Sequence, residues 1–267
     1  MDPRSLAAWE GRGHRSAAPP IHARLFLAGA PPGAPDLVLL HGIGMSGRSM
    51  IPTARLLAPV ARVFVPDLPG TGRSRAESGV PPGPAELADA LTRFLDEAGL
   101  ERAHIVANAS GCEVAIDLAA RRPWRVASLV LVGPTGDPEA RSWPRRLARW
   151  ARNAPREPLA LAPILVRDWL DAGLRRGLGT SARSLRDPLE RKLPWVEAPV
   201  LALRGSLDPI APARWVGRIA REVQRGRVAV VPGATHTVSY QSPLELSRVV
   251  RASLGLPLSD AKRRLLP

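Results

Sequence analysis

Three side chains that could carry out nucleophilic chemistry follow short apolar runs that are predicted to be strands: Ser110, Asp208 and His236. A hydroxyl, a carboxylate and an imidazole can together attack an acyl carbon, because the imidazole takes the hydroxyl proton and the carboxylate orients the imidazole. Asp208 and His236 lie 28 residues apart, which leaves room for one helix and one strand between them. We therefore expect both residues at the same edge of one sheet.

Short runs rich in valine and leucine alternate with helical patterns along most of the chain. The alternation predicts an α/β fold, in which a mostly parallel sheet is flanked by helices. The predicted strands cover residues 22–28, 37–40, 63–65, 104–107, 128–132, 200–204 and 227–231. The predicted helices cover residues 49–57, 84–98, 110–121, 213–222 and 243–254. Ligands of such a sheet bind beyond the carboxyl ends of its strands.

Residues 134–193 interrupt this alternation and predict a helical insertion. The segment has no strand-like run, shows helical spacing of apolar residues, and carries Trp143, Trp150 and Trp169. It holds 13 basic and 7 acidic residues, a net charge of +6. We expect a core domain made of residues 1–133 and 194–267, with residues 134–193 as a cap, or lid, over the active site.

Two loop motifs resemble those of the α/β-hydrolase family. The loop His41-Gly42-Ile43-Gly44 is similar to the family's HGxG loop, and residues 67–74, Asp-Leu-Pro-Gly-Thr-Gly-Arg-Ser, resemble its DxPGxGxS turn. The resemblance covers nearly the whole chain from residue 22 to residue 254. It implies an oxyanion hole formed by the N–H groups of Ile43 and Ser110, and a mainly structural role for Asp67.

The family's nucleophile motif, G-x-S-x-G, fits the segment Ala-Asn-Ala-Ser-Gly-Cys in two registers. The positions two before and two after the nucleophile must be small, because the strand and helix backbones nearly touch at this strained turn. With Ser110 as the nucleophile, these positions hold Asn108 and Cys112. With position 109 as the nucleophile, they hold Ala107 and Gly111, which satisfy the steric rule better.

The spacing to Pro123 favours the same register. Family members usually have a proline about fourteen residues after the nucleophile, and Pro123 lies fourteen residues after Ala109. We therefore favour Ala109 as the nucleophile position, in a chain without a hydroxyl there. A methyl group preserves the fold and the pocket while removing covalent catalysis. An engineered serine-to-alanine variant is the preferred interpretation, ahead of a natural non-catalytic protein.

The resemblance also gives roles to the late aspartate and histidine. Asp208, in Arg-Gly-Ser-Leu-Asp-Pro-Ile, resembles the acid that accepts the Nδ1–H of the catalytic histidine, and His236, in Pro-Gly-Ala-Thr-His-Thr, resembles the general base. The chain order of nucleophile, acid and histidine matches the family. Asp137, which follows the strand predicted at 128–132, is the alternative acid. The implied chemistry needs no metal and no organic cofactor.

The resemblance implies hydrolysis of a carboxylic ester, a lactone or a thioester by Ser-His-Asp chemistry, impaired in this chain at position 109. One alternative is C–C bond cleavage by the same triad, as in meta-cleavage hydrolases, and another is a non-catalytic ligand-binding protein. We expect the cap to select a small acyl substrate, with Gly42, Trp143, Arg146 and Trp150 in contact with it. The cap arginines are Arg141, Arg145, Arg146, Arg149 and Arg152. They either form a solvated helix face or bind an anionic group, such as the phosphate of a phosphopantetheine thioester.

The composition restricts the partners. The formal charge is +14, but only two of the 38 basic residues are lysines, which indicates a GC-rich genome at least as much as an anionic partner. No basic stretch is interleaved with stacking aromatics, so we expect no nucleic acid. No apolar run reaches the roughly 18 residues of a membrane span, and no export signal is visible, so we expect a cytoplasmic monomer or homodimer without a membrane partner. The lone Cys112 excludes an intramolecular disulfide.

Overall fold

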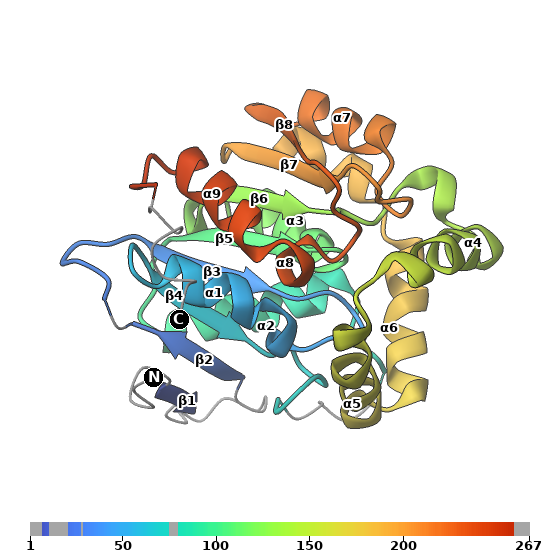
Figure 1. Ribbon diagram of the computed structural model, residues 1–267, viewed down its shortest axis with the longest axis horizontal. Helices are drawn as coiled ribbons and strands as arrows, with labels where there is room; N and C mark the ends of the chain where they lie inside the picture. Colours follow the sequence, from blue (N-terminus) through green and yellow to red (C-terminus); the bar gives the residue numbers. More distant parts are fainter. Residues whose placement is uncertain (1–6, 11–20, 28, 75–79, 259–267) are drawn as a thin grey trace.

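An eight-stranded β-sheet forms the centre of the computed structural model (Figure 1). The structure describes residues 7–10, 21–27, 29–74 and 80–258. The strands follow the spatial order β1-β2-β4-β3-β5-β6-β7-β8. Their bounds are Ala7–Glu10 (β1), His22–Phe26 (β2), Asp36–Leu40 (β3), Arg62–Pro66 (β4), Ala103–Asn108 (β5), Val126–Val132 (β6), Val200–Gly205 (β7) and Gly226–Val231 (β8).

All strands from β4 to β8 in this order are parallel, whereas β2 is antiparallel to both β1 and β4. The predicted α/β fold with a mostly parallel sheet is therefore confirmed. Strand β1 was not predicted, because its four residues, Ala-Ala-Trp-Glu, are too few to show a strand pattern. Residue 28, the predicted end of the first strand, lies outside the described residues.

Helices cover both faces of the sheet (Figure 1). Helices α2 (Pro84–Glu97), α3 (Gly111–Arg121) and α7 (Ala213–Glu222) contribute their apolar side chains to one hydrophobic core cluster. Helices α1 (Ile51–Leu57), α8 (Val238–Gln241) and α9 (Pro243–Ser253) contribute to the other. Since both faces are buried, the strands read as continuous apolar runs, as they do in β3 and β6.

Three helices occupy the segment between β6 and β7. They are α4 (Trp143–Asn153), α5 (Ala162–Ala172) and α6 (Leu174–Arg186); two short 3₁₀ turns join α4 to α5, and Gly173 alone separates α5 from α6. Figure 1 shows α4 and α6 beyond the arrowheads of β5 and β6, which is the carboxyl edge where parallel sheets bind ligands. Among the described residues, no helix is both long and apolar enough to cross a membrane.

Candidate active site

A strained turn joins β5 to α3 at Ala109. Its backbone φ is +52°, and it is the one non-glycine residue with a positive φ in the described part of the chain. The left-handed conformation is costly for any residue with a Cβ, so it persists only where the surrounding structure holds it in place. Ala109, and not Ser110, therefore occupies the tip of the turn, and Ser110 already has helical backbone angles.

Close backbone packing on both sides fixes the turn in this register. A Cβ added to Gly111 would lie 2.6 Å from the carbonyl oxygen of His41, so only glycine fits there. Ala107, two residues before the tip, is completely buried. A Cβ on Gly42 would lie 3.0 Å from the Cβ of Ala109. The small residues that the sequence places around position 109 thus match the steric demands of the turn.

Substitution of Gly111 tests this packing. We expect Gly111→Ala to lower the free energy of unfolding by about 2–3 kcal/mol, because its methyl group would overlap the backbone of the neighbouring loop. In the matched control Gly217→Ala, on helix α7, a Cβ meets only the flexible end of Arg221. That change should instead raise the unfolding free energy by roughly 0.5–1 kcal/mol. Urea denaturation measures both, and equal effects would contradict the packing argument.

Asp208 and His236 form a buried hydrogen-bonded pair at the ends of β7 and β8. The Asp208 Oδ2 lies 2.9 Å from the His236 Nδ1. The other carboxylate oxygen, Oδ1, accepts the N–H groups of Ile210 at 2.8 Å and Ala211 at 3.1 Å, so the carboxylate is held at both ends. Gly133 has a φ of +56° and packs against the pair, where a Cβ would lie 3.0 Å from Nδ1. The sequence prediction did not include Gly133.

The surroundings of the pair shift both pKa values toward the charged forms. Burial alone would raise the pKa of Asp208, but the charge of His236 and the hydrogen bonds to the carboxylate lower it below its usual value. Burial likewise opposes protonation of His236, yet the charges of Asp208 and Glu157 raise its pKa above 6.5. The His236 Nε2 is buried and has no hydrogen-bond partner among the described residues. This nitrogen is left to exchange a proton with a ligand or a nucleophile.

The raised pKa predicts how stability depends on pH. The pKa of His236 is higher in the folded state than the unfolded value of about 6.5, so its protonation stabilises the fold. This stabilisation is complete at pH values below the unfolded pKa. It disappears as the pH rises through the folded pKa. We expect the difference in unfolding free energy between the parent and His236→Gln to shrink as the pH rises from about 5 to 9. Urea unfolding across this range measures the difference. A difference that grows with pH would contradict the assignment.

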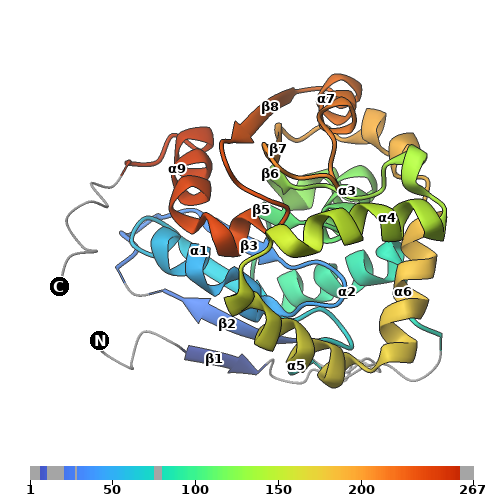
Figure 2. The same ribbon diagram turned by 45° about the vertical axis from the view of Figure 1, so that its right-hand side comes forward.

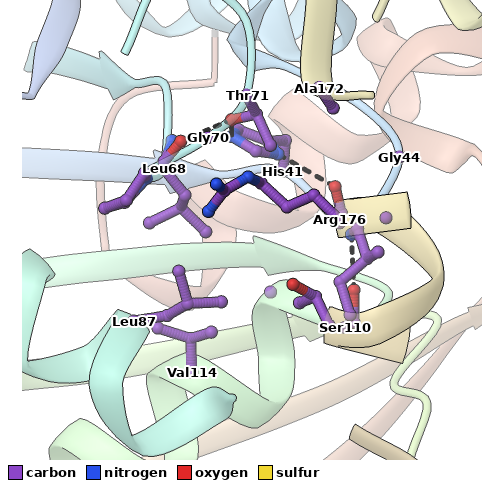
Figure 3. A pocket seen from close by; sticks show the side chains of 16 residues that line it. His41, Gly44, Leu68, Gly70, Thr71, Leu87, Ser110, Val114, Ala172 and Arg176 are labelled. Carbon is purple, nitrogen blue, oxygen red and sulfur yellow. Dashed lines mark hydrogen bonds between the residues drawn. The ribbon is translucent and has the colours of Figure 1, made fainter. Parts of the chain in front are cut away.

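The hydroxyl of Ser110 occupies the predicted oxyanion hole. The Ile43 N–H donates to the Ser110 Oγ at 2.6 Å, so this predicted donor is already engaged. A ligand oxygen can accept the Ile43 N–H only after the Ser110 hydroxyl turns away. The N–H of Ser110, the second predicted donor, has no acceptor among the described residues. Figure 3 shows Ser110 at the wall of a small neighbouring pocket of about 30 Å³, room for one water molecule, with Arg176 alongside.

A cavity of about 410 Å³ lies between the turn and the inserted helices. Ala109, Ser110 and His236 line it from the sheet side. All four predicted substrate contacts lie in its wall: Gly42, Trp143, Arg146 and Trp150. The Trp150 ring stands edge-on to the His236 imidazole, with centroids 6.4 Å apart. Trp169 also lines the cavity and packs against Gly44.

The arginines on α4, and Arg141 just before it, differ in their partners. Arg149 pairs with Asp137 at 2.7 Å, and Arg141 pairs with Glu190. Arg146 instead donates to the Ser181 carbonyl at 3.2 Å and the Ser184 hydroxyl at 3.3 Å, and no described carboxylate forms an ion pair with it. The exposed Arg145 donates to a backbone carbonyl, and Arg152 is exposed. Arg146 is therefore the cavity arginine without a direct ion pair among the described residues, although the buried Glu113 lies near enough for their charges to interact.

The alternative acid and the remaining histidines have other partners. Asp137 is held by Arg149 and Arg214 and forms no hydrogen bond to His236. Asp67 is buried, accepts from Arg24 at 2.8 Å and from the Gly47 and Arg73 N–H groups, and so holds its loop in place, as the resemblance implies. The ring of His41 accepts the Leu68 N–H through Nε2 at 3.0 Å. His104 bonds to Ser128, and His14 lies outside the described residues.

Two acidic residues of the insertion were missed by the sequence prediction. Glu157 accepts hydrogen bonds from the N–H and the hydroxyl of Thr237, next to His236. The buried Asp168 accepts from the Ser46 N–H at 2.6 Å, the Ser46 hydroxyl at 2.9 Å and Arg48 at 2.5 Å, on the loop that carries Ile43. These hydrogen bonds thus join the insertion to the loop that carries His236 and to the loop that carries Ile43. No sequence pattern could indicate these contacts, since each joins segments that lie 80 or more residues apart in the chain.

Comparison with known proteins identifies the class. A profile described as "Alpha/beta hydrolase family" matches residues 37–249, so the chain belongs to this family. It is similar to the pimeloyl-[acyl-carrier protein] methyl ester esterase of Aeromonas salmonicida, with 29% identity over 252 residues that cover 83% of this chain and 96% of the relative.

Solved structures agree on the fold. A hydrolase from Pseudomonas aeruginosa superimposes with a TM-score of 0.74 at 24% identity, covering 95% of this chain and all of the other. The enol-lactonase from Burkholderia xenovorans LB400 superimposes with a TM-score of 0.72 at 18% identity, covering 89% of this chain and 97% of the other. At these identities the likeness concerns the fold alone.

Proposed function

We propose that this chain is a hydrolase of carboxylic esters, lactones or thioesters whose Ser-His-Asp machinery lacks only the nucleophilic hydroxyl, at position 109. The observation that carries this proposal is the left-handed turn at Ala109, in the wall of the same cavity that is lined by His236, whose Nε2 has no partner among the described residues. The methyl group leaves the cavity open to an acyl ligand but cannot form an acyl-enzyme. The chain in this form binds its substrate and is catalytically impaired.

With a hydroxyl at position 109, the geometry supports acyl transfer. The His236 Nε2 accepts the hydroxyl proton while the oxygen attacks the acyl carbon, and the carbonyl electrons move onto the carbonyl oxygen. Asp208 holds the imidazole by its Nδ1–H and stabilises the imidazolium that forms. The tetrahedral intermediate then expels its leaving group, which takes the proton from Nε2. Water deprotonated by the same nitrogen hydrolyses the acyl-enzyme.

The oxyanion requires a movement of Ser110. The Ser110 N–H is available, and the Ile43 N–H becomes available once the Ser110 hydroxyl rotates away. Each such donor contributes about 3–4 kcal/mol to stabilisation of the transition state. In the present structure the Ser110 hydroxyl accepts the hydrogen bond of the Ile43 N–H, which would otherwise lack a partner, and an unpaired buried N–H costs free energy.

Residues 134–193 serve in this proposal as the lid that selects the substrate. Trp143, Trp150 and Trp169 give the cavity an apolar wall suited to an acyl chain. Arg146 would bind a carboxylate or a phosphate on the substrate, because its neighbours Arg141 and Arg149 already have carboxylate partners. The substrate is accordingly a small acyl compound with an anionic group.

One observation favours a second candidate, a non-catalytic ligand-binding protein. The Ser110–Ile43 hydrogen bond fills the oxyanion hole, as it could in a protein that no longer stabilises an oxyanion. A panel of esters, lactones, thioesters and β-diketones, each with and without a carboxylate, separates the candidates when tested on the Ala109→Ser protein. Turnover of the acyl compounds supports the proposal, and faster turnover of the carboxylated members supports the role of Arg146. Turnover of the diketones alone would indicate C–C cleavage, and binding without turnover would indicate the second candidate.

A further inference from the structure

An apolar strip covers the outside of the insertion. It consists of five aliphatic side chains on α5, on α6 and on the turn before α5. Their exposed fractions are 91% for Leu159, 62% for Val166, 78% for Leu170, 65% for Leu174 and 46% for Leu178. Aliphatic side chains exposed to this degree project into solvent. A contiguous group of exposed apolar side chains typically marks an interaction site. Figure 2 shows α5 and α6 together at the end of the molecule away from α7.

The strip has a repeated pattern of apolar and basic residues. Val166 and Leu170 are four residues apart on α5, and Leu174 and Leu178 are four apart on α6, so each pair shares a helix face. An exposed arginine follows the first member of each pair: Arg167 on α5 and Arg175 on α6.

No described residue neutralises the positive charge of the strip. Neither Arg167 nor Arg175 forms an ion pair or a hydrogen bond with a described residue. The two acidic residues of α5, Asp168 and Asp171, both pair with Arg48 of the core. The strip therefore presents aliphatic side chains beside unpaired guanidinium groups.

The strip is continuous with the mouth of the large cavity. Leu159 and Leu178 belong to the strip and also line the cavity. Leu147 and Trp150 of α4 are exposed and line the cavity as well. The strip and the cavity wall therefore share apolar side chains.

We propose that the strip docks on the surface of an anionic lipid bilayer. Aliphatic side chains enter the acyl boundary while arginines of the same helices contact anionic headgroups, the arrangement typical of helices that lie in the plane of a membrane. Protruding side chains suit insertion into lipid better than the groove that a partner helix would need. The chain's charge of +14 adds long-range attraction to such a surface. This surface departs from the expectation, drawn from sequence, that no membrane takes part.

Vesicle co-sedimentation of the full chain tests the proposal. We expect binding to vesicles that contain phosphatidylglycerol, weaker binding to pure phosphatidylcholine, and loss of binding at high salt. Arg167→Gln and Arg175→Gln should each weaken partitioning about fivefold, and the double variant Val166→Asn/Leu170→Asn about tenfold or more. The matched controls are Arg227→Gln and Val228→Asn on β8, which remove an exposed arginine and an exposed aliphatic residue elsewhere and should leave partitioning unchanged. Circular dichroism checks that each variant is folded.

Three results would overturn the proposal. The first is the absence of vesicle binding. The second is an equal loss of binding in the strip variants and the β8 controls, which would show that binding depends on net charge and not on the strip. Light scattering could show a dimer that Val166→Asn/Leu170→Asn converts to a monomer, in which case a second copy of the chain covers the strip. None of these measurements requires turnover, so the test stands apart from the proposed hydrolysis.

Discussion

Ala109→Ser is expected to raise the rate of ester hydrolysis over the parent chain by a factor on the order of 10⁴ or more. The turn, the cavity and the Asp208–His236 pair are already in place, so under the proposed function the substitution supplies the hydroxyl that the reaction needs. The new hydroxyl would occupy the turn where φ is +52°, and the unpartnered His236 Nε2 would accept its proton. Initial rates with a chromogenic ester, measured on parent and variant side by side, give the factor.

Two control variants locate the new activity. Adding His236→Gln to Ala109→Ser should return the rate to the parent level, because the introduced hydroxyl would have no base. Adding Ser110→Ala should leave the rate within about tenfold, since Ser110 contributes its backbone N–H, which alanine retains. Loss of all activity on Ser110→Ala would instead show that Ser110 is the nucleophile and that the choice of position 109 is wrong.

Asp208→Asn, placed in the Ala109→Ser protein, is expected to lower kcat by about 10⁴-fold. Asp208 receives the Nδ1–H of His236 and thereby keeps Nε2 free to act as the base. An amide would donate to Nδ1 and favour the tautomer whose proton sits on Nε2, which cannot accept another. The imidazolium formed during the reaction would also lose its counter-charge. The pH profile of kcat/KM provides a second readout, because loss of Asp208 lowers the His236 pKa.

Asp137→Asn is the matched control for this loss. Asp137 lies on the loop after β6 and pairs with Arg149 and Arg214. Its replacement should change kcat by less than about tenfold, since it forms no hydrogen bond to His236. A larger loss from Asp137→Asn than from Asp208→Asn would show that the acid comes from the β6 loop.

Much of the fold was predictable from sequence because its signals are local. The apolar runs of β3, β5 and β6 reflect burial on both faces, and residues 213–222 coincide with helix α7 as predicted. The register of the turn also followed from local sterics, because the need for small residues at 107 and 111 is a property of neighbouring backbones. Strand β1 gave no such signal, because it forms only through pairing with β2.

Parts of the candidate site could not be predicted, because they depend on contacts between distant segments. The Ser110–Ile43 hydrogen bond joins residues 67 positions apart, and the Asp168–Ser46 contact spans 122. Residue types indicate which side chains can form hydrogen bonds, but they do not indicate which distant residue each side chain binds. The same holds for the cap arginines, because the carboxylates that pair with Arg141 and Arg149 come from other segments of the chain, and Arg146 has no such ion pair among the described residues.

Covalent labelling tests the central claim most directly. The parent chain and the Ala109→Ser protein are each treated with a fluorophosphonate, which reacts with activated serines, and the peptide that spans residues 103–121 is sequenced by mass spectrometry. The account predicts a phosphonyl adduct on position 109 of the variant, abolished by His236→Gln, and no adduct on the parent. An adduct on Ser110 in either protein, or an unlabelled variant that is correctly folded, would contradict it.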